Sequence, residues 1–333
     1  MDNTIDDPLV VAATAGDERA FAELTGRYRR ELHVHCYRML GSFDDAEDRV
    51  QDTFLRAWRK RATFEGRSTY RAWLYRIATN SCLEVLRRAP RATVALSAGT
   101  RTLPPYSTMP WLQPYPDALL DARASADEAP DVLVVAKETI ELAYLAAIQL
   151  LPPRQRAALI LRDVLAFSAA ETASLLDETT AAVNSALQRA RATLQKHRDS
   201  GAFEAPAPTP TATERELLKR YMDAHEHSRP ADVVELLRAD VRLTISPHGM
   251  CWDGRDEVAP SFVEHMNDLG EFRCVATRAN RQPAVANYLR AWGDTIYRAF
   301  TLVVLGIQDG ELTDMATFAR PELFTAFGLA PTL

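Results

Sequence analysis

The spacing of apolar residues divides the chain into two helical segments and one mixed segment. Over residues 8–90, apolar side chains such as Phe54 and Trp58 recur three or four positions apart, which predicts amphipathic helices. The same spacing returns over residues 131–200. Residues 212–333 open with an amphipathic helix and continue with runs rich in β-branched and aromatic residues, which predict strands. The expected fold is multidomain: two all-α helical domains followed by an α+β domain.

Proline-rich stretches separate these segments. Residues 91–130 contain several prolines that exclude a long helix, and residues 201–211 contain alternating prolines that favour extended chain. We expect both to be linkers. At about 3.3 Å per residue the first can extend beyond roughly 100 Å. Within it, Trp111–Pro116 combines two aromatic residues with prolines, so we expect this segment to dock onto another surface rather than only to span a gap.

Charge is strongly segregated along the chain. The net charge is −6, but residues 1–52 carry 6 basic and 12 acidic side chains, whereas residues 53–90 carry 9 basic and 2 acidic ones. The last third, residues 201–333, is again acidic, with 13 basic and 19 acidic side chains. Short basic helices in an acidic protein favour focused contact with a polyanion, since phosphate neutralisation needs local positive charge. The alternative is that these are ordinary solvated helix faces.

The sequence contains no recognisable metal-binding motif and no recognisable catalytic nucleophile. Its four cysteines have no CxxC or CxxH spacing, so we expect neither a zinc site nor a disulfide, and no other cofactor. No catalytic residue is predicted, because no nucleophile has a recognisable base. The N-terminus lacks a basic segment followed by an apolar core, and no apolar run reaches about 20 residues. We therefore expect a cytoplasmic protein with no membrane contact.

A helix-turn-helix is predicted within the second helical domain. Ser168 and Glu171 have the spacing of a capping box, and Thr179 is placed to cap a second helix. One face of that helix is apolar; the other presents Asn184, Ser185 and Gln188, whose side chains can bond base edges in the major groove. Arg189 and Arg191 suit phosphates. A three-helix bundle without DNA-binding activity can show the same spacing.

The surrounding residues resemble a known family. The string LPPRQRAALILRDVLAFSAAETASLLDETTAAVNSALQRARATL resembles region 4 of bacterial sigma-70-type initiation factors. The resemblance implies that its second helix reads the minus-thirty-five promoter element through Asn184, Ser185 and Gln188. Arg189 and Arg191 would contact the DNA backbone, and this domain would meet the flap region of core RNA polymerase.

The first helical domain carries a more specific resemblance. DDAEDRVQDTFLRAWRK resembles region 2.2 of sigma factors, which docks on the clamp helices of the largest polymerase subunit. This implies that Asp48, Gln51 and Asp52 contact core RNA polymerase. A charged helix face that is merely solvated is the alternative.

The next segment, FEGRSTYRAWLYRIATNSCLEVLRR, interleaves arginines with aromatic residues. Melting a duplex requires cations for phosphates and surfaces on which an unstacked base can stack. The string resembles sigma regions 2.3 and 2.4, whose loop captures a flipped base of the minus-ten element. We expect Trp73 to belong to the core. The expected surface residues that contact promoter DNA are Phe64, Arg67, Ser68, Tyr70 and Arg71, together with Arg76.

Two promoter-binding modules without a central helix bundle resemble the extracytoplasmic-function (ECF) class of sigma factors, and the aromatic linker segment is similar to that of members with a C-terminal extension. Residues 212–333 resemble a SnoaL-like domain, of the nuclear transport factor 2 (NTF2)-like fold. His225, His248, Trp252, His265 and Trp292 are candidates to line a pocket there.

The leading hypothesis is an ECF sigma factor, not an enzyme, whose fused domain regulates activity through contact with the sigma domains or the linker. The alternatives are a ligand-binding or catalytic SnoaL-like protein with a DNA-binding anchor, and a simple helix-turn-helix repressor.

Overall fold

The computed structural model describes residues 7–91, 103–121, 140–199 and 211–333. The chain forms two compact units: unit 1 comprises residues 1–103 and 123–203, and unit 2 comprises residues 104–122 and 204–333. The first expected linker is thus divided, since its middle belongs to unit 2. The remaining linker positions 92–102, 122–130 and 201–210, and the expected helical start 131–139, lie outside the described residues.

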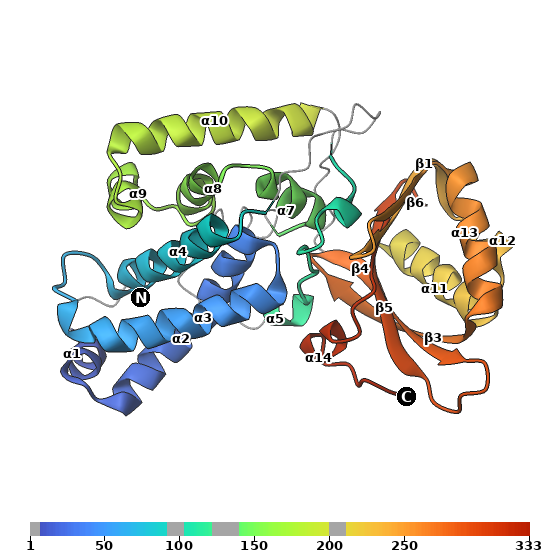
Figure 1. Cartoon of the computed structure of the whole chain (residues 1–333), viewed down its shortest axis with the longest axis horizontal. Helices are drawn as coiled ribbons and strands as arrows, with labels where there is room; N and C mark the ends of the chain where they lie inside the picture. Colours follow the sequence, from blue (N-terminus) through green and yellow to red (C-terminus); the bar gives the residue numbers. More distant parts are fainter. Residues whose placement is uncertain (1–6, 92–102, 122–139, 200–210) are drawn as a thin grey trace. The chain divides into compact units, whose positions relative to one another are not determined.

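Unit 1 begins with helices that start at capping residues (Figure 1). They are α1 (Pro8–Ala15), α2 (Glu18–Leu40), α3 (Phe43–Lys60), the short η1 (Arg61–Thr63) and α4 (Tyr70–Arg88). Asp17, Ser42 and Thr69 cap α2, α3 and α4 by accepting backbone N–H bonds. Gly41 ends α2 with a φ of 67°, which lets the chain reverse and α3 pack against α2.

The second half of unit 1 contains the predicted helix-turn-helix. Its elements are α7 (Leu142–Gln149), α8 (Pro153–Leu159), the π-helical turn η3 (Ile160–Val164), α9 (Ala169–Leu176) and α10 (Thr180–Asp199). The capping box of Ser168 and Glu171 is present, and Thr179 Oγ1 accepts the Ala182 N–H at 3.1 Å. Asp177 ends α9 with a φ of 52°, which makes the tight turn between the two helices.

Unit 2 is built on one mixed sheet, so the expected α+β class is confirmed. The strands are β1 (Leu237–Ser246), β2 (Met250–Asp253), β3 (Gly270–Ala279), β4 (Gln282–Ala291), β5 (Arg298–Gln308) and β6 (Glu311–Phe318). Their order is β2-β1-β6-β5-β4-β3, with β1 and β6 parallel and the other neighbours antiparallel. The strand β3 therefore forms one edge of the sheet.

Helices cover the sheet of unit 2 on the side of its main core (Figure 1). They are α11 (Ala212–Glu226), α12 (Pro230–Val234) and α13 (Arg255–Asp268), while α14 (Leu323–Ala326) follows β6. Leu217 and Tyr221 of α11 pack with Val258 of α13 and with apolar residues from the strands. The linker part of unit 2 adds η2 (Tyr106–Thr108), which contacts β1, and α5 (Asp117–Asp121), which contacts β3.

Candidate polymerase, promoter and linker interfaces

The predicted polymerase-contacting residues divide into an outer and an inner set on α3. Asp48 and Gln51 are exposed, and the exposed side chain of Leu55 lies one turn further along the helix. Asp52 instead faces α4, where it accepts hydrogen bonds from Ser81 at 2.7 Å and Arg56 at 2.8 Å. Burial acts to raise the pKa of Asp52, but these bonds outweigh it and hold the pKa below its usual value. Asp52 thus joins two helices of the bundle.

The aromatic residues before and within α4 differ from the sequence expectation. Tyr70 is fully buried and Phe64 is nearly so, whereas Trp73 is only half-buried. The prediction of Phe64 and Tyr70 as surface residues is therefore corrected, and so is that of Trp73 as core. The reason is a three-ring cluster: the rings of Phe64 and Tyr70 lie 5.3 Å apart, and both contact Trp73. Arg67 and Ser68 are exposed, as expected.

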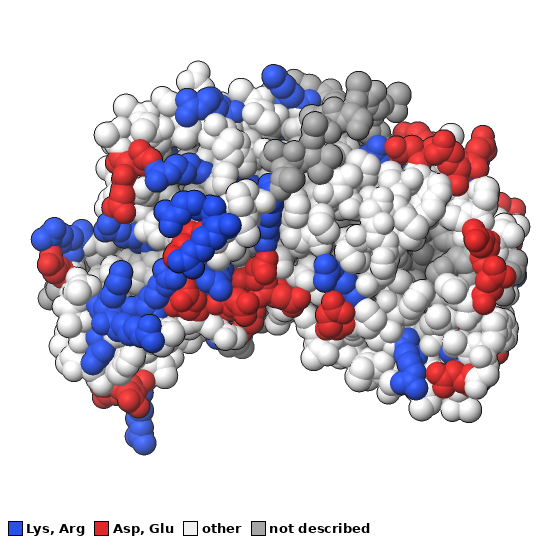
Figure 2. Space-filling model, viewed as in Figure 1, with Lys and Arg blue, Asp and Glu red and all other residues white. Residues whose placement is uncertain are grey.

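Two arginines of α4 that are predicted to contact promoter DNA, Arg71 and Arg76, are engaged within unit 1. Arg71 pairs with Glu31 of α2 at 2.9 Å and lies over the rings of Tyr75 and Phe167, at 4.9 and 5.4 Å. Arg76 pairs with Asp177, the residue of the helix-turn-helix turn, at 2.5 Å. One face of α4 therefore packs against the helix-turn-helix. Figure 2 shows Lys and Arg side chains gathered on this part of unit 1 beside a group of Asp and Glu.

Helix α10 has the predicted two faces. Val183, Leu187 and Ala190 are buried. The exposed side carries Asn184, Ser185, Gln188 and Arg189. Arg191, expected to contact the DNA backbone, makes two bonds to Asp163 at 2.6 and 2.9 Å, which raise its pKa above the usual value. This pair attaches α10 to the π-helical turn and fixes the orientation of the exposed polar face.

A buried arginine joins the two helical modules, and sequence reasoning did not identify it. Arg156 of α8 donates to the carbonyl oxygen of Met39 at 2.5 Å, at the C-terminal end of α2. It also donates to the side-chain and backbone oxygens of Gln149, both at 2.6 Å, and to the carbonyl of Leu151 at 3.1 Å. Burial lowers the pKa of Arg156 to about 9. The Gln149 amide completes the junction by donating to the Arg38 carbonyl at 3.0 Å.

Unit 2 holds the aromatic linker segment through the turn between β3 and β4. Tyr115 N donates to the Asn280 side chain at 2.8 Å, and Asn280 N donates to the Tyr115 carbonyl at 2.9 Å. Asp117 accepts from the Arg281 backbone at 2.8 Å and from Arg278 Nε at 3.1 Å. We call these five residues the linker clasp. Each residue from Leu112 to Asp117 is buried, so the segment is docked rather than solvated.

The backbone of this turn is adapted to the linker. Asn280 and Arg281 both have positive φ values, 54° and 65°. The left-handed conformation costs little for asparagine but more for arginine, and it directs both backbone N–H groups at the linker. Burial raises the pKa of Asp117, while the bonds from Arg281 and Arg278 oppose that shift. The carboxylate therefore depends on its partners in this clasp.

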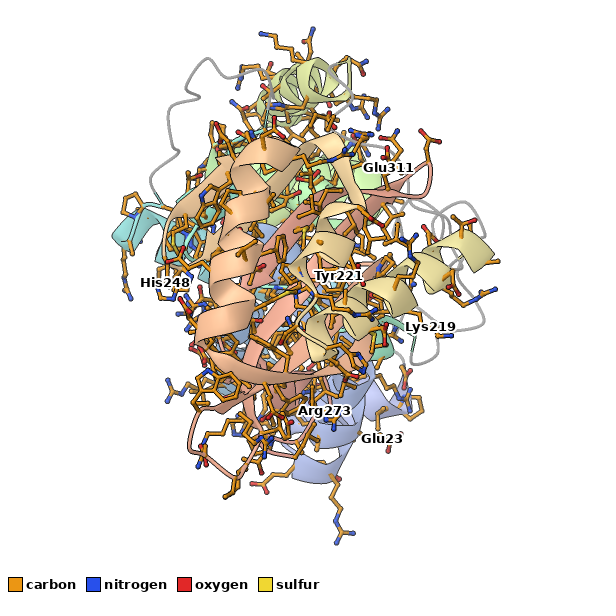
Figure 3. The ribbon with its side chains drawn as sticks, turned by 90° about the vertical axis from the view of Figure 1, so that its right-hand side faces the viewer. Glu23, Lys219, Tyr221, His248, Arg273 and Glu311 are labelled. Carbon is orange, nitrogen blue, oxygen red and sulfur yellow. The ribbon has the colours of Figure 1, made fainter. Side chains whose placement is uncertain are left out.

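Of the five candidate pocket residues of unit 2, the four whose side chains are described lie in different settings, and none of them lines the hollows between α11 and β3. His225 is buried in the core, its ring 4.2 Å from that of Tyr221 and 5.7 Å from that of Phe262. His248 is exposed at the β1–β2 turn, and Figure 3 shows it apart from Tyr221. Trp292 is 65% exposed beyond the end of β4, while Trp252 packs against the core. His265 lies on α13, and its side chain is outside the described set.

Within 7–91, 103–121, 140–199 and 211–333, no group of three or more His, Cys, Asp or Glu side chains could hold a metal ion. Among those same residues, no helix is long and apolar enough to span a membrane.

Family models match the two helical modules separately. The model described as Sigma-70 region 2 matches residues 24–92, and the one described as Sigma-70, region 4 matches residues 141–194. The first covers most of α2 and all of α3 and α4, and the second covers the helix-turn-helix.

Whole-chain comparisons extend this similarity to unit 2. The chain is 39% identical over 342 aligned positions to the ECF RNA polymerase sigma factor SigG of Mycobacterium tuberculosis, covering 98% of this chain and 90% of that protein. It is 32% identical to SigM of the same organism, over 57% of this chain and 83% of SigM. The crystal structure of Mycobacterium tuberculosis SigJ has the same fold, with a TM-score of 0.56, 22% identity, and coverage of 93% of this chain and 99% of SigJ. The chain therefore belongs to the ECF RNA polymerase sigma factors, which direct transcription initiation and are not enzymes, and it carries a C-terminal α+β domain.

Proposed function

We propose that this sigma factor docks on core RNA polymerase through the exposed face of α3 and reads the minus-thirty-five element through α10. The observation that carries the proposal is the outward row of Asn184, Ser185 and Gln188 over a buried apolar face. Amide and hydroxyl groups on one side of a recognition helix are suited to base edges in the major groove. Arg67 and Ser68 of the loop before α4 are positioned to contact the minus-ten element. Such a factor acts in the cytoplasm, with the polymerase.

The experiment is promoter-dependent transcription by purified core polymerase and the full chain. Gln188→Ala is expected to lower transcript yield roughly 5- to 160-fold on a promoter that the wild type uses, since a bidentate base contact contributes about 1–3 kcal/mol. Gln155→Ala on α8 is the matched control, and it should leave the yield unchanged. Equal yields from wild type and Gln188→Ala would refute the assignment of base contact to this face.

Polymerase docking is tested in the same system by measuring affinity for core enzyme. Asp48→Ala combined with Gln51→Ala is expected to weaken it, whereas Glu23→Ala, an exposed acid of α2, is not. If the chain binds promoter duplex tightly in a gel shift without core enzyme, and core enzyme changes nothing, it is a simple repressor instead. A SnoaL-like enzyme with a DNA anchor is favoured only if unit 2 alone turns over a substrate.

Promoter binding requires unit 1 to open. The two promoter elements lie roughly two helical turns apart, about 70 Å. In unit 1, by contrast, Arg76 of α4 bonds Asp177 at the helix-turn-helix turn, and Phe167 stacks edge-on against Tyr75 at 5.5 Å. A chain with these contacts closed cannot place both modules on one promoter, so we propose that core polymerase binding separates them.

We further propose that unit 2 regulates initiation by holding the linker. The linker joins the two modules and is long enough to pass through a polymerase channel, but the clasp fixes its middle on unit 2 through Tyr115 and Asp117. A linker held in this way is not available to span the separated modules. The clasp is therefore inhibitory, and its release activates the factor.

Asp117→Asn tests this inhibition. Asp117 accepts one bond on each carboxylate oxygen, whereas the amide of Asn has a single acceptor oxygen, so the change removes one of the two bonds and turns an N–H donor toward another donor. A hydrogen bond to a charged group contributes about 1.5–3 kcal/mol. The fraction of molecules in which the linker has left the clasp should rise at least about tenfold. The yield of promoter-dependent transcripts should increase with it. Asp294→Asn, which removes an acid that pairs with Arg298 elsewhere on unit 2, is the control. Lower or unchanged transcription from Asp117→Asn would overturn the inhibitory role.

A further inference from the structure

A hollow in unit 2 adjoins the linker clasp. It lies between α11 and β3, encloses about 270 Å³, and is lined by Leu218, Ala276, Thr277 and Pro283 together with three charged side chains, Glu214, Arg215 and Arg278. A second hollow of about 400 Å³ shares Arg215, Leu218 and Ala276 and continues along α11, where Lys219, Met222, Asp223 and Glu226 line it. The two form one groove, of the size that small-molecule sites have.

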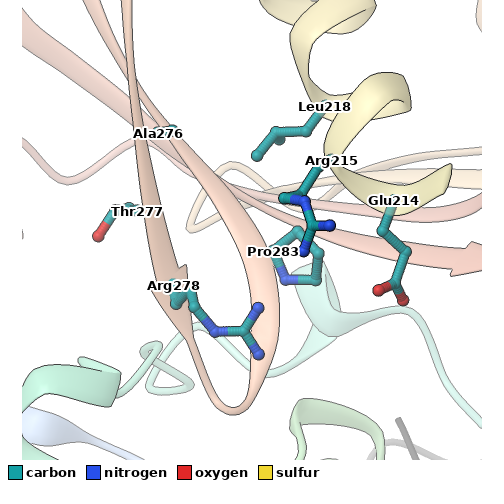
Figure 4. Close-up of a pocket in the computed structure, with 7 residues that line it drawn as sticks. All are labelled: Glu214, Arg215, Leu218, Ala276, Thr277, Arg278 and Pro283. Carbon is teal, nitrogen blue, oxygen red and sulfur yellow. The ribbon is translucent and has the colours of Figure 1, made fainter. Parts of the chain in front are cut away.

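The walls and the mouth of the groove differ in chemistry. Leu218, Ala276 and Pro283 provide apolar surface, whereas Arg215 from α11 and Arg278 from β3 provide guanidinium groups. Figure 4 shows the Arg215 guanidinium between the helix and the β3–β4 hairpin, and the Arg278 guanidinium at the hairpin near its turn. The carboxylate of Glu214 accepts the Thr211 N–H in a capping box, which holds it at the helix end but leaves its negative charge in place. The clasp end of the groove therefore combines an apolar floor with two guanidinium groups and one carboxylate.

Arg278 belongs to both the groove and the clasp. Its Nε donates to Asp117 and its Nη2 donates to the Arg281 carbonyl at 2.8 Å. A guanidinium carries five N–H donors, and about 29% of this side chain is exposed, so it can donate to a further anionic partner. An anion that draws Arg278 into the groove weakens its bond to Asp117. The side chain of Asp117 is only 5% exposed, so its charge then loses part of its compensation.

We infer that the groove between α11 and β3 binds a small amphipathic anion, with a carboxylate or phosphate head on Arg215 and Arg278 and an apolar body against Leu218, Ala276 and Pro283. The bound anion competes with Asp117 for Arg278 and loosens the linker clasp. By linkage, a docked linker weakens binding of the anion by the same factor. This inference rests on the proposed function for its biological meaning, because it supplies the signal that releases the linker.

The test uses the full chain and hexanoate as the probe, with two readouts that need no polymerase. Binding is followed by saturation-transfer NMR on hexanoate, and linker release by hydrogen exchange of the peptide containing residues 112–118, whose Tyr115 amide is bonded to Asn280. Saturating hexanoate should accelerate exchange of this peptide at least threefold. Hexanamide, which has the same body without the charge, should not, and inorganic phosphate, which lacks the body, should bind more weakly than hexanoate.

Ala276→Trp places a bulky side chain in the groove from an exposed position that makes no clasp contact. It should abolish hexanoate binding and its effect on exchange while leaving linker exchange without hexanoate unchanged. Met250→Trp, on the exposed β2 at the other end of the sheet, is the matched control and should bind normally.

Three outcomes would overturn the inference: binding that survives Ala276→Trp, an equal response to hexanamide, or binding without faster linker exchange. These outcomes are distinguishable from failure of the proposed function, since that is measured as transcription with core polymerase.

Discussion

Replacement of Arg156 by alanine is expected to lower the free energy of unfolding of unit 1 by about 3 kcal/mol or more. Four oxygens, on Met39, Gln149 and Leu151, accept hydrogen bonds from this guanidinium. Each buried acceptor that is left unpaired costs about 1–3 kcal/mol, and the truncated side chain leaves a cavity as well. The cost of burying the charge, seen as a pKa lowered to about 9, offsets part of this loss. Urea denaturation followed by circular dichroism measures the difference.

Arg154→Ala is the matched control, because this arginine is two residues earlier in the chain and its side chain is 63% exposed. Its ion pair with Glu178 lies at the surface, where such pairs contribute at most about 1 kcal/mol. A loss of less than 1 kcal/mol in Arg156→Ala would mean that the buried bonds do not stabilise the junction between the modules. Arg156→Lys separates charge from geometry: one ammonium cannot reproduce the fork of donors, so most of the loss should remain.

The helix-turn-helix was predictable because its signals are local. The capping box of Ser168 and Glu171, the cap at Thr179 and the alternation of apolar and polar positions along α10 all act within one or two helical turns. The same holds for Asp48 and Gln51, which the period of α3 places outward. Asp52 has the same local pattern but is held by Ser81, 29 residues further along the chain, which periodicity does not reveal.

The aromatic residues around α4 show where local reasoning fails. Phe64 and Tyr70 have a surface-like setting in the sequence, next to Gly66, Arg67 and Ser68. Their burial depends on a loop that folds back so that three rings meet, which no spacing rule specifies. The junction made by Arg156 and the linker clasp failed to appear for a related reason. Met39, the partner of Arg156 in the other module, and Arg281, the partner of Asp117, each lie more than 100 residues away in the sequence. Docking of the Trp111–Pro116 segment was expected, but the turn that receives it was not.

The stability of unit 1 is expected to fall by about 4 kcal/mol between pH 7 and pH 5. Burial lowers the pKa of His35 from 6.5 to about 3 and that of His33 to about 4, and neighbouring arginines contribute to both shifts. In the unfolded chain both imidazoles take up protons below pH 6.5, whereas in the folded chain they stay neutral. The contribution of these two histidines to the free energy of unfolding is therefore complete above pH 6.5. It is lost as the pH falls toward 4, the folded-state pKa of His33, and then toward 3, that of His35. At pH 5 each histidine accounts for about 2 kcal/mol.

Other groups also titrate between pH 7 and pH 5. The share of the pH dependence that each histidine causes is therefore found by comparing the wild type with a variant that lacks that histidine. His35 lies against Thr79, whose hydroxyl is 2.9 Å from Nε2, and against the ring of Tyr75 at 5.0 Å. Gln is the replacement that keeps a polar group near Thr79 without a titrating proton, so His35→Gln should remove about half of the pH dependence whatever it does to stability at pH 7. His33→Gln, nearer the surface beside Glu47, should remove a similar share. If both variants retain the full loss between pH 7 and pH 5 in urea denaturation, the acid sensitivity arises elsewhere and the imidazoles are not held neutral.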